Sequence, residues 1–171
     1  MDKLDIVTDE SGNEVVLLPE IIFSNKQNIN WNDVEDYLGK YVGELIEIAE
    51  TRDIIYIGNK FPDEYGGSSY TRKTKGARAN AAQGIREMVE IATDKVYREN
   101  HKEKHSEDAH NGWFYYVTRF AIPLYNNEKK TGEYNVYSAC LVVNHAANGK
   151  MYLYDVVGIK KEASNPLKTI K

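Results

Sequence analysis

Cysteine is almost absent from this chain, which carries a single one, Cys140, among 171 residues. One cysteine cannot form an internal disulfide, and it cannot supply the thiolate cage of a structural zinc site. Long apolar runs are missing too, because no stretch approaches the roughly 18–20 apolar residues that span a bilayer, and residues 1–5 lack the apolar core of a signal peptide. We therefore expect a cytoplasmic protein with no membrane contact. A phage virion or an injected toxin is the alternative.

A large excess of either charge is also missing. The 22 basic and 26 acidic residues give a net charge of −4. This balance excludes a generally basic nucleic-acid-binding coat, but it allows a local basic groove. With 42% hydrophobic and 11% aromatic residues, the chain can fill the core of one domain. We predict a single domain over residues 1–171, with a folded core over about 15–163, a flexible start and a loose tail.

Helical patterns predominate in the first half of the chain. Apolar residues recur at helical spacing from Trp31 to Ala49, and Asn32 is placed to cap this helix. A longer apolar stripe predicts a second helix from Ala77 to about Glu99. The segment between the two helices contains a short β-branched run at 54–58, typical of a strand, and a glycine-rich loop at 59–76.

Strand patterns fill the last third. Residues 114–122 alternate with a period of two, and residues 134–144 and 151–159 follow as further strands after turn-rich connections. Three meandering strands after a helical half define an α+β fold. We predict a helical N-terminal half packed on a C-terminal antiparallel sheet.

Residues 70–78 are rich in cations directly before the second predicted helix. They include Arg72, Lys73, Lys75 and Arg78. Backbone N–H groups at a helix start, together with lysine or arginine, form a site for phosphate or another anion. A solvated basic turn is the alternative interpretation.

The polar segment 101–110 holds three of the four histidines. His101 and His105 are spaced so that they would share one helix face and could hold a metal ion, but the HExxH pattern and a third ligand are missing. A single histidine can instead act as an acid or base if its pKa and its position suit the reaction. An exposed charged linker is the third interpretation.

Arg119 is the least expected residue of the predicted strands, where it stands among aromatic and apolar neighbours. A cation on a sheet face is costly unless it pairs with a carboxylate or meets an anionic ligand. Tyr115, Tyr152, Tyr154 and His145 belong to the same sheet, where tyrosines can stack nucleobases or simply pack. The chain has no glycine-rich phosphate loop, no GxSxG elbow and no zinc pattern. These residues therefore favour a site without metal or cofactor that acts on an anionic substrate.

Many short motifs, in order along the chain from about Leu18 to Pro166, resemble a phage-associated nuclease family. The motifs are Leu18-Pro19-Glu20-Ile21, Ile55-Tyr56-Ile57-Gly58, Phe61-Pro62-Asp63-Glu64-Tyr65, Ala79-Asn80-Ala81-Ala82-Gln83-Gly84-Ile85, Lys104-His105, Asp108-Ala109, Gly112-Trp113, Thr118-Arg119-Phe120-Ala121, Tyr134-Asn135-Val136, Tyr152-Leu153-Tyr154-Asp155 and Ile159-Lys160-Lys161-Glu162. The family belongs to the barnase–EndoU–colicin–RelE class and occurs as C-terminal toxin or effector modules of Mu-type head proteins and polyvalent phage proteins.

This resemblance implies metal-independent RNA cleavage by attack of a ribose 2′-OH on the adjacent phosphate. It assigns catalysis to Lys104, His105, Arg119 and Tyr154. Residues expected at the substrate are Arg72, Lys75, Arg78, Asn80 and Tyr115. Arg78 stands where the family pattern has lysine, and Tyr115 stands where it has arginine. Because arginine keeps its proton, we expect Arg78 to bind phosphate rather than to donate a proton.

The implied partners are RNA, including tRNA or ribosome-associated RNA, and a cognate immunity protein or a host defence protein. A non-catalytic phage protein that binds a host defence factor is the alternative function, and a structural virion domain is a third. The functions differ in geometry. A nuclease requires His105, Arg119 and Arg78 to converge on one cleft.

Overall fold

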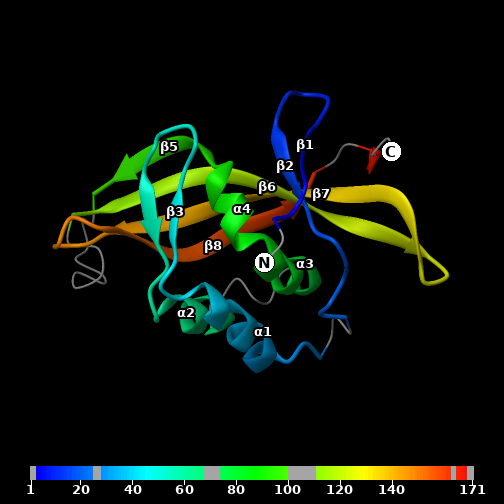
Figure 1. Cartoon of the computed structure of the whole chain (residues 1–171), viewed down its shortest axis with the longest axis horizontal. Coiled ribbons are helices and arrows are strands. Elements are labelled where there is room, and N and C mark those ends of the chain that lie inside the picture. Colours follow the sequence, from blue (N-terminus) through cyan, green and yellow to red (C-terminus); the bar gives the residue numbers. More distant parts are fainter. Residues whose placement is uncertain (1–2, 25–27, 68–73, 100–110, 163–164, 169–171) are drawn as a thin grey trace.

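Three long antiparallel strands form the centre of the fold (Figure 1): β6 (Trp113–Asn126), β7 (Lys129–His145) and β8 (Met151–Lys161). The structure is a computed structural model that describes residues 3–24, 28–67, 74–99, 111–162 and 165–168. β6 and β7 are joined by a tight turn in which Asn127 and Glu128 both have positive φ. The alternating patterns of the sequence therefore predicted these three strands and their antiparallel pairing correctly.

Shorter strands extend this centre into one curled sheet of nine described strands. β2 (Glu14–Leu17) and β5 (Thr93–Arg98) pair with opposite halves of β6 along the same edge, β2 in parallel and β5 antiparallel. β4 (Ile54–Tyr56) pairs in parallel with the start of β8. The outermost strands are β1 (Ile6–Thr8), β3 (Leu45–Glu47) and β9 (Leu167–Lys168). The sheet is therefore mixed, and our prediction of a purely antiparallel sheet was wrong.

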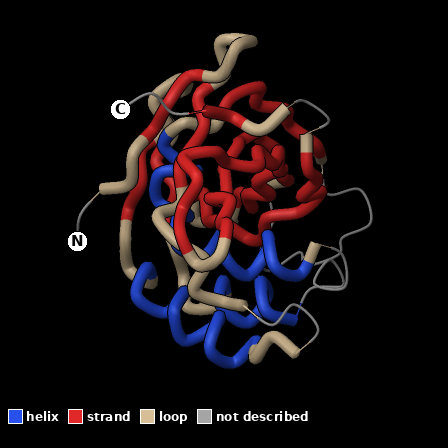
Figure 2. The backbone as a smooth tube through the Cα atoms, turned by 90° about the vertical axis from the view of Figure 1, so that its right-hand side faces the viewer, coloured by secondary structure: helices blue, strands red, loops and turns tan. Residues whose placement is uncertain are grey.

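The helices are short and gather largely on one side of the curled sheet (Figure 2). They are α1 (Trp31–Leu38), α2 (Phe61–Gly67), α3 (Lys75–Ala81) and α4 (Ile85–Glu90), with 3₁₀ turns at η1 (Gly39–Tyr41) and η3 (Ala82–Gly84). Asn30, not the expected Asn32, caps α1 by accepting a hydrogen bond from the Asn32 backbone. Among the described residues, no helix has the length and apolar character needed to cross a membrane.

Strands and helices interleave along the chain, so the predicted division into a helical half and a sheet half was also wrong. The helix expected to reach Glu99 ends at Glu90, because residues 93–98 pair with β6 as β5. The helix expected to reach Ala49 ends at Leu38, and β3 follows the 3₁₀ turn. The loop expected at 59–76 contains α2. The start and the tail expected to be loose contribute β1 and β9.

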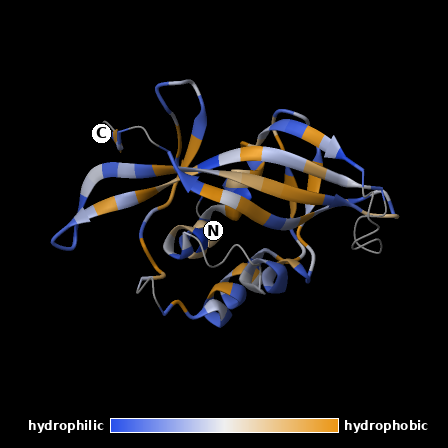
Figure 3. Ribbon diagram, turned by 180° about the vertical axis from the view of Figure 1, so that it is seen from behind, coloured by the Kyte–Doolittle hydropathy of each residue, from blue (hydrophilic) through white to orange (hydrophobic). Residues whose placement is uncertain are grey.

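The main core lies between the helices and one face of the sheet. Tyr116 and Phe120 of β6 point into it, as the alternation of their strand predicts. Thr118, on the same face, donates a hydrogen bond to the Met88 carbonyl of α4 at 2.7 Å. Hydrophilic and hydrophobic residues both occur along the long strands (Figure 3). A small second cluster joins Val15, Leu17, Ala121 and Val136.

Candidate functional site

A cleft of about 330 Å³ opens where β4, α2 and the turn between β7 and β8 meet. Polar and aromatic side chains line it together, among them Lys60, Glu64, Asn144, Asn148, Tyr152 and Tyr154. Its volume lies near the lower end of the roughly 300–1,000 Å³ typical of small-molecule sites. The cleft thus has the size and the side chains of a site for one small polar ligand.

A second hollow, of about 420 Å³, lies between the N-terminal segment, η1 and α4. Its charged side chains pair with one another. Lys3 lies 3.2 Å from Glu90, and Arg86 lies 2.7 Å from Glu44. Although this hollow is larger than the cleft, these ion pairs already engage much of its charge, so the cleft is the stronger candidate.

A β-bulge in β8 brings Tyr154 to the cleft. Val142 of β7 pairs with Asp155, whereas its neighbour Val143 pairs with Leu153, so Tyr154 is the extra residue between the two registers. Such an extra residue bends the strand and redirects a side chain. The Tyr154 ring meets the edge of Trp113 with the ring centres 5.0 Å apart. Tyr154, which the sequence placed in the site, therefore lines the cleft in a fixed setting.

Asn144 is the residue of the cleft that sequence reasoning missed. It lies in β7 between Trp113 and Tyr152 and is only 7% exposed. Its side-chain oxygen Oδ1 is buried and has no hydrogen-bond partner among the described residues. An unpaired buried polar group costs roughly 1–3 kcal/mol. The sequence signal that could have identified Asn144 is its amide, which directly follows the apolar run Leu141-Val142-Val143.

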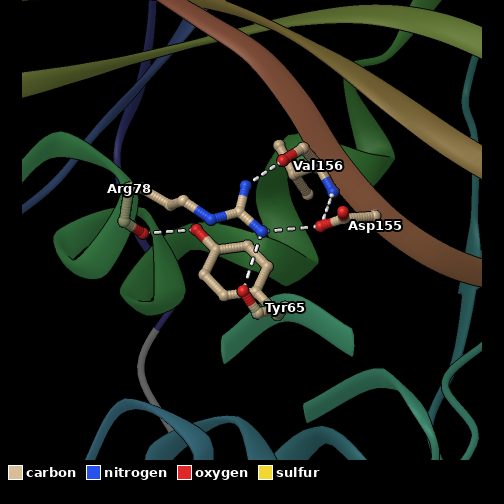
Figure 4. A network of polar contacts seen from close by, with 4 residues as sticks. All are labelled: Tyr65, Arg78, Asp155 and Val156. Carbon is tan, nitrogen blue, oxygen red and sulfur yellow. Dashed lines mark hydrogen bonds and ion pairs between the residues drawn. The ribbon is translucent and has the colours of Figure 1, made fainter. Parts of the chain in front are cut away.

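Arg78 lies in the interior and not at a surface (Figure 4). Its guanidinium donates to the Val156 carbonyl, to the Tyr65 carbonyl at 2.8 Å and to Asp155 Oδ1 at 2.7 Å. The Tyr65 hydroxyl in turn donates to the Arg78 carbonyl, and burial raises the pKa of this hydroxyl. The expectation that Arg78 binds a substrate phosphate is therefore corrected. With 0% exposure, this arginine holds α2, α3 and β8 together.

Arg119 occupies the predicted face of β6, away from the helices, but it is paired. Its Nε lies 2.8 Å from Glu162 Oε1, and the two side chains are 21% and 30% exposed. Tyr115, on the same face, lies under the guanidinium of Arg98 at 5.6 Å. Neither Arg119 nor Tyr115 lines the cleft. The nuclease geometry required Arg119 and Arg78 to meet in one cleft, and they do not.

The remaining predicted residues lie in three different settings. Asn80 is buried, and its amide accepts from the Ile22 and Phe23 backbones and donates to the Phe23 and Gly76 carbonyls, so it serves the fold and not a substrate. Lys75 begins α3 beside a shallow hollow that Tyr137 also lines. Arg72, Lys104 and His105, like His101, lie outside the described residues.

No group of three or more His, Cys, Asp or Glu side chains that could hold a metal ion occurs within the described part of the chain.

No family model, no curated protein and no solved structure matches this chain. The resemblance to phage nucleases thus remains a hypothesis carried by the motifs alone.

Proposed function

We propose that this protein is a metal-independent endoribonuclease of phage or mobile-element origin and that the cleft beside Tyr154 receives its RNA. The observation that carries the proposal is the meeting of Tyr154, which the resemblance assigns to the active site, with a second tyrosine, Tyr152, and an unpaired buried amide oxygen. Rings that stack bases and amides that read base edges are the groups used to bind single-stranded RNA.

The Lys104-His105 motif supplies the acid–base chemistry in this proposal. His105 removes the proton of a ribose 2′-OH or protonates the leaving 5′-oxygen, and Lys104 stabilises the negative charge that develops on the phosphate. Asn111, the first described residue after this segment, donates from its side chain to the Ala146 carbonyl at 2.8 Å. Ala146 lines the cleft, so Asn111 contacts the cleft wall. Neither Arg78, which is buried, nor Arg119, which pairs with Glu162 outside the cleft, keeps its expected role as a phosphate ligand in this proposal.

The decisive experiment incubates the protein with tRNA, ribosomes and total RNA in EDTA and identifies the ends of the fragments. We expect cleavage that leaves 2′,3′-cyclic phosphate and 5′-hydroxyl ends. The His105→Ala variant, purified in parallel, controls for contaminating nucleases and should lose about 10²–10⁴-fold in rate, the usual contribution of an acid–base group. His101→Ala should stay close to the wild-type rate. Activity that disappears in EDTA and returns with a divalent ion would contradict the proposal.

A second candidate function is a non-catalytic module that binds a host defence protein or a cognate immunity protein. It is favoured by the ion pairs of Arg78 with Asp155 and of Arg119 with Glu162, which engage two expected phosphate ligands. Intact RNA in every arm of the assay, together with a stable complex between the protein and a bacterial protein, would decide for this candidate.

A further inference from the structure

We infer that the cleft is a subsite for a single nucleobase that carries an exocyclic amino group, and that Asn144 recognises this group. The inference rests on the proposed function, because RNA supplies the base. Nothing in the motifs assigned Asn144 a role. Within the described part of the chain its buried Oδ1 has no donor, and a base amino group would supply one.

The size of the cleft sets the size of its ligand. A volume of about 330 Å³ suits one nucleotide and excludes a folded RNA element. A base must therefore leave its stack to enter, which is how sequence-specific proteins generally read single-stranded RNA. The cleft thus suits an unstacked base in a flexible strand and not a base inside a helix.

The aromatic side chains of the cleft are held in place before any ligand arrives. Tyr152 packs against Tyr56 with ring centres 5.6 Å apart, and its hydroxyl accepts a 3.3 Å hydrogen bond from Asn148. Tyr154 packs against Trp113. Stacking on such rings stabilises a bound base with little regard to its identity. A hydrogen-bonding side chain must therefore distinguish the bases, and Asn144 is the buried side chain of the cleft that can do so.

The chemistry of Oδ1 determines which bases fit. An amide oxygen only accepts hydrogen bonds. An exocyclic amino group, as in cytosine and adenine, donates to it, whereas a carbonyl oxygen in the same position places two acceptors face to face. Exchange of amino for oxo converts cytosine to uracil and adenine to hypoxanthine and also turns the adjacent ring nitrogen from an acceptor into a donor, so the two ligand pairs test this edge of the base and the Asn144 variant assigns the contact.

The test measures binding of CMP, UMP, AMP and IMP to the whole chain by calorimetry. We expect the amino member of at least one pair to bind at least about fivefold more tightly than its oxo partner, the lower limit for a hydrogen bond to a buried group. In Asn144→Leu this preference should vanish, while the melting temperature is unchanged or higher, because an unpaired buried oxygen has been removed. Asn135→Leu, which alters an amide on the same strand outside the cleft, should keep the preference.

Three other outcomes overturn the inference, and a fourth contradicts only the proposed function. Equal binding within both pairs, or tighter binding of the oxo bases, would show that Asn144 Oδ1 does not receive an amino group. An Asn144→Leu variant that melts earlier and keeps the preference would make Asn144 a packing residue. Saturable binding of CMP or AMP without any RNA cleavage would support the base subsite and contradict the nuclease. Cleavage at an unaltered rate and site by Asn144→Leu would support the nuclease and contradict the subsite.

Discussion

The Arg78 side chain lies along the edge of β8, where a neighbouring strand would otherwise pair. β8 pairs with β4 only over Met151 and Tyr152, so the carbonyls further along that edge lack a neighbouring strand. The guanidinium donates to one of them, at Val156, and to the Asp155 carboxylate beside it. Because Asp155 follows Tyr154 and Tyr65 belongs to the helix that carries Glu64, the Arg78 contacts fix both walls of the cleft.

Replacement of Arg78 by methionine removes the guanidinium that lies 2.7 Å from the buried Asp155 carboxylate. We expect Arg78→Met to lower the free energy of unfolding by about 3–5 kcal/mol, as is typical when one member of a buried pair is removed. Urea denaturation would measure the loss. The double variant Arg78→Met/Asp155→Leu should regain part of it, since the buried carboxylate is removed as well. A single variant within 1 kcal/mol of wild type would show that the pair does not stabilise the fold.

Among the elements, the β3–β4 hairpin is tied to the sheet by a polar contact at its tip. Asp53 accepts a 2.8 Å hydrogen bond from the Tyr116 hydroxyl and lies 2.8 Å from Lys95 of β5. Burial disfavours the Asp53 carboxylate, but hydrogen bonds from Lys95, Thr51 and Tyr116 outweigh this effect and lower its pKa below the ordinary value of 3.8. The contact joins segments that only the folded chain brings together.

The lowered pKa of Asp53 gives this contact a pH dependence. Because the carboxylate is favoured in the folded state, its stabilisation is complete above the ordinary pKa of 3.8 and is lost as the pH falls from there through the lower pKa of the folded state. We expect Asp53→Asn to lower the free energy of unfolding by about 1 kcal/mol at pH 7 and to have almost no effect near pH 2. Urea denaturation at both pH values tests this. An equal loss at both would contradict it.

The sequence pattern predicted helices and strands well where the burial of residues follows the periodicity of their hydrophobic pattern. It predicted them poorly where pairing with a distant strand decides whether a segment forms a helix or a strand. β6, β7 and β8 alternate clearly because one face meets the core. In β5, Val96 continues the helical stripe of the preceding segment, yet it is 48% exposed, and pairing with β6 makes the segment a strand. α2 was missed because Pro62 and two glycines resemble a loop, although proline is tolerated in the first helical turn.

The residues of the candidate site could also be predicted only in part. The motif around Tyr154 assigned this residue to a site, and Tyr154 lines the cleft. Asn144 could not be identified from the sequence, because the lack of a partner for its oxygen depends on which strands flank it. Arg78 was assigned to the wrong environment for a related reason. Arg78 is one of four cations in residues 70–78, and it resembles a surface cation until its buried carboxylate partner, 77 positions away, is known.

At the scale of the whole molecule, the N-terminal strand belongs to the main core. Val16 and Leu18 are fully buried, and a Cβ on Gly84 would lie 3.3 Å from Val16 and 3.0 Å from Leu18. The strand therefore packs closely against the turn that joins α3 to α4. One end of the chain and its middle thus share a single packed interior.

Deletion of residues 1–18 should abolish cooperative unfolding. Truncation of one buried leucine costs about 2–5 kcal/mol, and a whole domain has only about 5–15 kcal/mol of stability, so loss of the strand with Val16 and Leu18 removes much of it. Thermal melting followed by far-UV circular dichroism would show the loss of the transition. Leu18→Ala, as the graded control, should keep a transition at lower temperature. A truncated chain with a sharp wild-type transition would show that β2 is dispensable.

The pairing of β2 with β6 also sets an order of events during synthesis. Val16 pairs with Phe120, and a ribosome that adds roughly 5–20 residues per second makes the second residue about 5–20 s after the first. Until then the apolar stretch Val15-Val16-Leu17-Leu18 lacks its partner strand. During this interval the growing chain therefore carries, without its strand partner, an apolar segment that the folded protein buries.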